Sequence, residues 1–166
     1  MSTTITPTRF SNELLLLLTE TFESVNGIYL DQGNSLLETL AGITADEASI
    51  PVGNKCASIA AQATHVCFYL DVLDRYLKTG QDEEVDWGEV WRTVQQVTPE
   101  AWVALQERVK RTYERTVQSI RSYERWDAEN SIAGAIGIVA HTTYHLGEIR
   151  QATCTVKKID LRKLFF

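Results

Sequence analysis

Residues 130–156 read NSIAGAIGIVAHTTYHLGEIRQATCTV, and this stretch decides the expected fold. It predicts a long helix that starts near Asn130 or Ser131. The apolar residues in its first half are Ile132, Ile136 and Val139. Gly134 and Gly137 lie among them, although glycine in a helix interior costs about 1 kcal/mol relative to alanine. We therefore expect a neighbouring helix to approach closely at these two positions.

Three other stretches carry the spacing of amphipathic helices. The first begins near Ser11 or Asn12, with an apolar stripe of Leu15, Leu18, Phe22, Val25 and Tyr29. The second covers residues 56–78, and Gly80 is well placed as the residue after its end. The third opens with Thr98 as a cap and Pro99 in the first helical position.

No convincing strand pattern occurs in the sequence. Four long amphipathic helices in a chain of 166 residues predict an all-α fold, a four-helix bundle. The long connection between the first two helices is compatible with a crossover between distant ends of the bundle.

The composition is typical of one soluble globular domain, with 44% hydrophobic residues, 23% charged residues and a formal net charge of −6. We expect a single domain over residues 1–166, and disordered, collagen-like and disulfide-stapled chains are excluded. A nucleic-acid partner usually meets a basic surface, so none is expected. The one basic cluster, within residues 157–163, is expected to pack on the body or on a second subunit.

Three cysteines without motif spacing favour a reducing compartment. The apolar run Leu14–Leu18 is too short to span a bilayer, and no secretory signal is recognised. We therefore expect a cytoplasmic protein that has no membrane partner.

The chain has only three histidines. His141 and His145 are four residues apart, which places both on one helix face, where two imidazoles can bind one ion. His65 lies in the middle of another helix and completes a three-histidine set if the second and fourth helices are neighbours. Spacing alone leaves open that all three are ordinary core or surface histidines.

Other metal motifs do not fit these residues. The zincin motif needs glutamate directly after its first histidine, where this chain has Thr142. A di-iron bundle needs Glu-x-x-His pairs, and none of the three histidines has glutamate three residues before it. Cys67 points off the face of the helix that carries His65, because it is only two residues away.

The segment His141-Thr-Thr-Tyr-His145-Leu-Gly-Glu-Ile-Arg-Gln151 resembles the last-helix motif of the DinB-like (DinB/YfiT) superfamily, and His65 matches that family's first ligand. The resemblance covers nearly the whole chain. It implies a four-helix bundle of the up-down-down-up type, often a homodimer. It also implies a divalent metal, commonly zinc or nickel, held by His65, His141 and His145, in an enzyme that acts on a small molecule with a low-molecular-weight thiol as cofactor.

Three neutral histidines would leave a coordination position open, as in a catalytic zinc site. Water bound there would suit a hydrolase, and a thiol bound there would suit a transferase. The resemblance favours S-transfer. A non-catalytic, metal-stabilised bundle that binds a ligand remains an alternative.

Two polar residues are candidate catalytic groups. Glu148 is three residues after His145 and faces roughly the same way, where relatives frequently have glutamine. We expect it to orient a ligand or to lie at the surface rather than to act as a base. Tyr69, four residues after His65, is expected to be an ordinary packed tyrosine rather than an acid or base.

Four further expectations concern neighbours of the histidines. Gln62, one turn before His65, could contact a metal ligand. Tyr144 is expected to point elsewhere on its helix. Trp87 and Trp91, an i,i+4 pair that suggests a short helix, are expected to pack in the core, with the mouth of a pocket as the alternative.

Overall fold

A computed structural model of the chain describes residues 4–54, 56–80, 84–94 and 96–157. These residues form helices and loops without a strand, which confirms the expected all-α class. In chain order the elements are α1 (Pro7–Phe22), α2 (Leu36–Ala41), α3 (Ala45–Ala48), the 3₁₀ turn η1 (Val52–Asn54), α4 (Ile59–Thr79), α5 (Glu89–Thr93), α6 (Pro99–Ser122) and α7 (Ser131–Val156).

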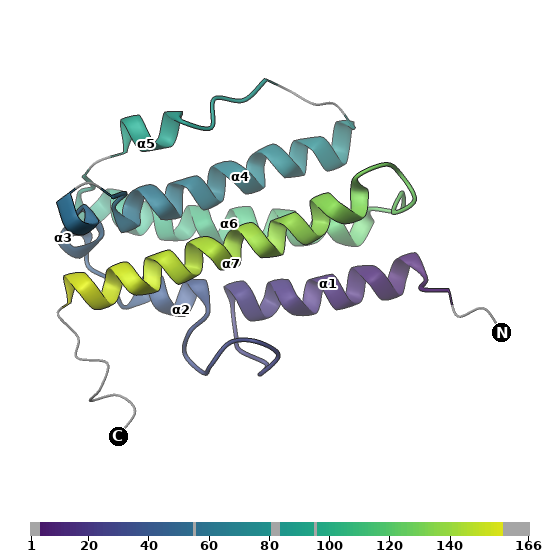
Figure 1. Ribbon diagram of the computed structural model, residues 1–166, viewed down its shortest axis with the longest axis horizontal. Helices are drawn as coiled ribbons and strands as arrows, with labels where there is room; N and C mark the ends of the chain where they lie inside the picture. The colour runs from purple at the N-terminus through teal and green to yellow at the C-terminus, as the bar shows by residue number, and fades with distance from the viewer. Residues whose placement is uncertain (1–3, 55, 81–83, 95, 158–166) are drawn as a thin grey trace.

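Helices α1, α4, α6 and α7 are the longest and lie side by side (Figure 1). Helix α4 packs against both α6 and α7, and α1 packs against the same two helices. In Figure 1, α1 and α7 run in one direction, whereas α4 and α6 run in the opposite one. The two helices that carry the histidines, α4 and α7, are therefore neighbours.

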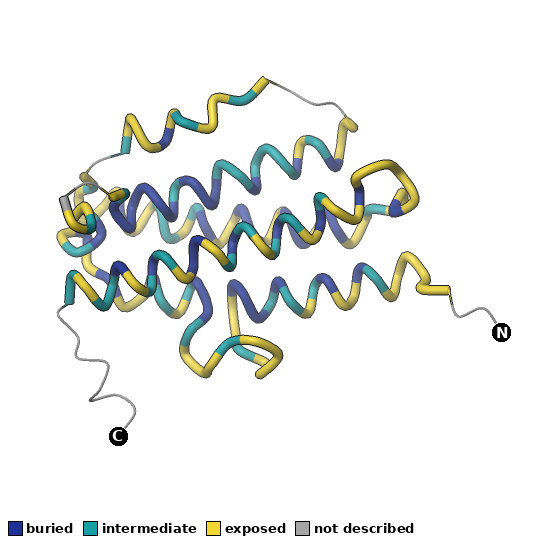
Figure 2. Tube along the Cα trace, viewed as in Figure 1, coloured by how far each residue is buried: buried dark blue, intermediate teal, exposed yellow. Residues whose placement is uncertain are grey.

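The inner faces of the four long helices meet in one apolar core, seen as the dark blue segments of Figure 2. Burying a side chain of the size of leucine, isoleucine or phenylalanine contributes about 1.5–3 kcal/mol to the stability of the fold, compared with leaving it exposed. The largest completely buried apolar side chains are Phe22, Leu18, Leu36, Leu40, Ile59, Leu70, Ile120, Ile138, Leu146 and Ile149.

Helix α1 begins and ends earlier than its apolar stripe predicted. Thr6 is the cap, because its side-chain oxygen accepts the backbone N–H of Arg9, and Pro7 follows in the first turn. The helix ends at Phe22, so the predicted continuation through Val25 to Tyr29 is wrong.

The buried carboxylate of Glu20 explains this early end. It accepts the backbone N–H groups of Asn26, Ile28, Tyr29 and Leu30 at 2.7–3.1 Å. Burial alone would raise the pKa of Glu20, but the four N–H groups outweigh it and hold that pKa below the ordinary 4.5. The loop coils around the carboxylate instead of continuing the helix.

The predicted boundaries at the end of α4 and the start of α6 are confirmed. Gly80 has a φ of 67° and closes α4 in the left-handed conformation that favours glycine. Thr98 caps α6 by accepting the N–H of Ala101 at 3.2 Å, and Pro99 is the first helical residue. The start of α4 differs slightly, since Ser58 is its cap.

Helix α7 has the predicted bounds, and the apolar residues of its first half are not all buried. Ile132 and Ile136 are exposed, and the buried residues of the helix are Ser131, Ala135, Ile138, Thr142, His145, Leu146, Ile149 and Ala152. The expected helix approach at Gly134 is wrong, because no atom of another described element lies within 4 Å of its Cβ position. At Gly137 the neighbour is the hydroxyl of Tyr69, 3.4 Å from that position.

The end of α7 is tied to the connection between α1 and α4. Lys157 Nζ donates to the carbonyl of Gly42 and lies 3.6 Å from the carboxylate of Glu47. The remaining residues of the basic cluster lie outside the described residues. No helix within the described ranges has both the length and the apolar character needed to cross a membrane.

Candidate metal centre

The three histidines meet between α4 and α7. His141 is central: its Nε2 lies 3.3 Å from Nε2 of His65 and 3.2 Å from Nε2 of His145. One ring nitrogen from each residue lies within 4.8 Å of the others. The predicted three-histidine set is therefore close enough to bind one metal ion.

Two of the separations between these nitrogens match a shared ligand sphere, while the set of three extends to 4.8 Å. Zinc binds imidazole nitrogen at about 2.0–2.1 Å, and two ligands of a tetrahedral site are then about 3.3–3.4 Å apart. The two Nε2 separations at His141, 3.3 and 3.2 Å, are close to this value. Nε2 of His141 could donate a hydrogen bond to only one of the two neighbouring Nε2 atoms. A cation, by contrast, attracts the lone pairs of all three Nε2 atoms.

Burial keeps the three imidazoles neutral at pH 7. Burial, followed by repulsion from a protonated His145, lowers the pKa of His65 and of His141 to about 4. Burial also lowers the pKa of His145, although Glu148 partly opposes the shift. A neutral imidazole is the form that binds a metal ion.

Contacts from both helices orient His145. Its Nδ1 lies 2.5 Å from Oε1 of Gln62 on α4 and 2.9 Å from Oε2 of Glu148 on α7. An ionised carboxylate only accepts hydrogen bonds, so Nδ1 carries the proton and the Nε2 lone pair faces the cluster. Such a contact to the second nitrogen is typical of metal-binding histidines. Gln62 and Glu148 are thus both within hydrogen-bond distance of one of the three histidines.

Aromatic rings hold the other two imidazoles. The Tyr69 ring is stacked on His141 with centroids 3.5 Å apart and an interplanar angle of 11°. The Trp91 ring lies 4.4 Å from the ring of His65. The Nδ1 atoms of both histidines are buried without a hydrogen-bond partner among the described residues, so packing rather than hydrogen bonding positions these rings.

Tyr144 also belongs to the site, contrary to its predicted direction. Its ring lies 5.0 Å from the ring of His145, and its hydroxyl donates to Oε1 of Glu148 at 2.9 Å. Both carboxylate oxygens of Glu148 are thus in use. The i,i+4 spacing of Tyr144 and Glu148 is the sequence signal that could have revealed this contact.

The expectation that Trp87 and Trp91 pack in the core is wrong. The two residues are 44% and 38% exposed, respectively. Trp91 covers His65, and Trp87 lies against Phe68 and Tyr69 with centroids 5.7 and 5.8 Å apart. The short helix α5, predicted from this pair, lies along α4 (Figure 1).

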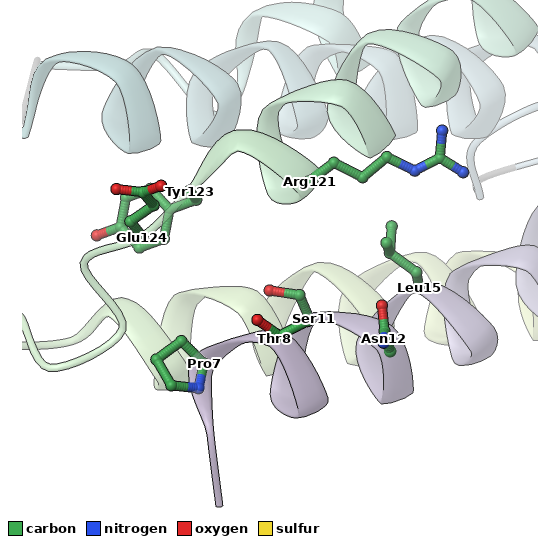
Figure 3. A pocket seen from close by; sticks show the side chains of 8 residues that line it. All are labelled: Pro7, Thr8, Ser11, Asn12, Leu15, Arg121, Tyr123 and Glu124. Atoms are coloured by element: carbon green, nitrogen blue, oxygen red, sulfur yellow. The ribbon is translucent and has the colours of Figure 1, made fainter.

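Two hollows between α1 and α6 provide a contrast. One, with a volume of about 180 Å³, is drawn in Figure 3, and the other has about 210 Å³. Leu15 and Arg121 line both hollows, and no histidine or cysteine lines either. They therefore offer no soft or imidazole ligands for a transition metal.

Comparison with known proteins leaves the site to be judged on its own geometry. No family model, no curated protein and no solved structure matches the chain.

Proposed function

We propose that the chain is a DinB-like four-helix bundle that holds zinc or nickel through His65, His141 and His145 and catalyses a reaction of a small molecule. The observation that carries the proposal is that the Nε2 atoms of His65 and His145 lie 3.3 and 3.2 Å from Nε2 of His141, with all three imidazoles neutral. The opposed directions of the four long helices agree with the up-down-down-up order of that family. The proposal includes a cytoplasmic homodimer.

S-transfer from a low-molecular-weight thiol is the favoured reaction. A divalent ion on three neutral imidazoles would supply Lewis acidity that deprotonates a bound thiol or water. Hydrolysis would benefit further from a free general base. Glu148 is poorly placed for that role because His145 and Tyr144 occupy its two oxygens.

The thiol would come from outside the protein. Burial raises the pKa of the Cys67 thiol to about 11, so it is inert at neutral pH. Cysteine is not part of the metal-binding cluster found in the described ranges. The protein's own residues would hold the ion, orient His145 and keep the site partly dry.

The test is a turnover screen. Purified protein supplied with zinc or nickel is mixed with electrophilic and ester substrates, with and without several low-molecular-weight thiols. The proposal predicts thiol-dependent product formation that is abolished by a chelator and by His141→Ala/His145→Ala. Metal binding without thiol-dependent turnover would instead support a non-catalytic bundle, and turnover of esters without thiol would support a hydrolase.

A further inference from the structure

The four tryptophans fall into two classes. Trp102 and Trp126 are 3% and 5% exposed, and their indole N–H groups donate to Ile43 O at 2.7 Å and to Ser11 Oγ at 2.9 Å. Trp87 and Trp91, by contrast, leave about two fifths of their surface exposed. If packing were their only role, leaving two indole rings of one short segment about two fifths exposed to water would be energetically unfavourable.

The segment that carries these two indoles is anchored between them. Val90 is the buried residue of α5. The rings of Trp87 and Trp91, on either side of Val90, pack against residues of α4 and remain partly exposed to solvent. Trp91 also lies 6.1 Å from the ring of His145, so it approaches ligands from both α4 and α7.

Each of the three histidines has its own aromatic neighbour. His65 has Trp91, His141 has Tyr69, and His145 has Tyr144. Trp91 and Tyr144 are exposed, and Tyr69 is partly buried. Grouped aromatic surface beside a cluster of polar, ion-binding atoms is the usual composition of a small-molecule site.

We infer that Trp87 and Trp91, with Tyr69 and Tyr144, bind a planar aromatic group of the substrate whose reacting atom lies at the metal. The inference rests on the proposed metal site and adds the substrate class to it. Contact between two aromatic rings raises the binding affinity about 2- to 10-fold compared with contact between a ring and an aliphatic group of equal size. The rings would thus select aromatic over aliphatic substrates.

The experiment uses three metal-binding probes that differ only in the attached group: acetohydroxamate, cyclohexanecarbohydroxamate and benzohydroxamate. The full chain is loaded with cobalt(II), whose visible absorption reports both occupancy of the site and binding of each probe. The variants are Trp87→Ala, Trp91→Ala and the conservative Trp91→Phe. Trp126→Phe is the matched control. It alters a buried tryptophan whose ring packs away from the three histidines.

The inference predicts that benzohydroxamate binds about 2- to 10-fold more tightly than the cyclohexane probe. Both alanine variants should lose this preference, while Trp91→Phe and Trp126→Phe retain it. Acetohydroxamate affinity should stay unchanged in Trp87→Ala, because the ring of Trp87 packs on Phe68 and Tyr69 rather than on a histidine. If Trp91→Ala loses cobalt, Trp87→Ala and Trp91→Phe still provide the comparison.

Equal affinities for the aromatic and cyclohexane probes, with cobalt bound, would overturn the inference and leave the metal site standing. A preference that survives both alanine changes would overturn it as well. Failure of the wild-type chain to bind cobalt would overturn the proposed function itself. A second copy of the chain could instead cover the two indoles. In that case the indole fluorescence will shift when the protein is diluted to monomer, and the probes will not change that fluorescence. This outcome also contradicts the inference.

Discussion

The Nδ1 atom of His145 lies 2.9 Å from Oε2 of Glu148, one turn later on the same helix. Gln62 of α4 approaches the same Nδ1 atom to 2.5 Å. One imidazole therefore links α4 to α7 through its Nδ1 side while its Nε2 side faces the other two histidines. This asymmetry makes His145 the most firmly oriented imidazole of the three, and it leads to a first prediction.

Glu148→Ala should weaken metal binding about 10- to 100-fold, because His145 loses the acceptor that orients it. Glu148→Gln should lose less, since an amide oxygen can still accept from Nδ1. Competition with a chromophoric chelator measures the affinity. Glu107→Ala, which removes an equal charge from an exposed position of α6, is the control. Equal affinities for the alanine variant and the wild type would contradict an orienting role.

The metal-free protein should lose stability as the pH falls from 6.5 towards 4. Burial holds the pKa of His65 and of His141 at about 4, below the 6.5 of an unfolded chain. In that range the unfolded state binds more protons, so their contribution is complete above pH 6.5 and is lost as the pH falls. Urea unfolding at several pH values, with chelator present, measures this. The loss should be smaller in His141→Gln, and an identical pH dependence would contradict the assignment.

Glu20 should stabilise the fold at neutral pH and lose this effect in acid. Its folded-state pKa lies below 4.5, so the contribution is complete above 4.5 and disappears as the pH falls through the lowered value. Glu20→Gln should be less stable at pH 7 and less sensitive to acid, because an amide offers only one oxygen to four backbone donors. Thermal unfolding of both proteins at pH 7 and below pH 4.5 tests this. A variant as stable as the wild type at pH 7 would show that the loop does not depend on the carboxylate.

Zinc should stabilise the folded chain. At a free concentration about 100 times the Kd, a ligand bound only by the folded state adds about 2.7 kcal/mol. For a chain of this size that is a rise in Tm of about 5–10 °C. Differential scanning fluorimetry with and without zinc measures it. His141→Ala should remove the rise, whereas Trp126→Phe should preserve it. A rise of equal size in the His141 variant would show that zinc binds elsewhere.

Local signals in the sequence were sufficient for the helix ends that depend on neighbouring residues. Thr98 and Pro99 start α6, and Gly80 ends α4, because caps act within a few residues along the chain. The end of α1 was not predictable in this way. Glu20 accepts hydrogen bonds from backbone N–H groups six to ten residues later, and the spacing of apolar residues gives no information about such a contact.

The site was predictable to a similar degree. The i,i+4 spacing put His141 and His145 on one face, and His65 completed the set on the condition that its helix was a neighbour, which the resemblance also implied. The positions of Trp87 and Trp91 were predicted wrongly because they depend on where α5 lies against α4, which no local pattern encodes. The exposure of Ile132 and Ile136 on α7 was not predictable from the sequence, because only packing decides which of two apolar faces turns inward.

The most direct test of the account is the metal content of the purified chain. After incubation with zinc or nickel and removal of excess ion, elemental analysis should give about one equivalent per chain. His141→Ala/His145→Ala should give none, while Glu107→Ala should match the wild type. A wild-type chain without stoichiometric metal, or a double variant that retains it, would contradict a metal centre at His65, His141 and His145.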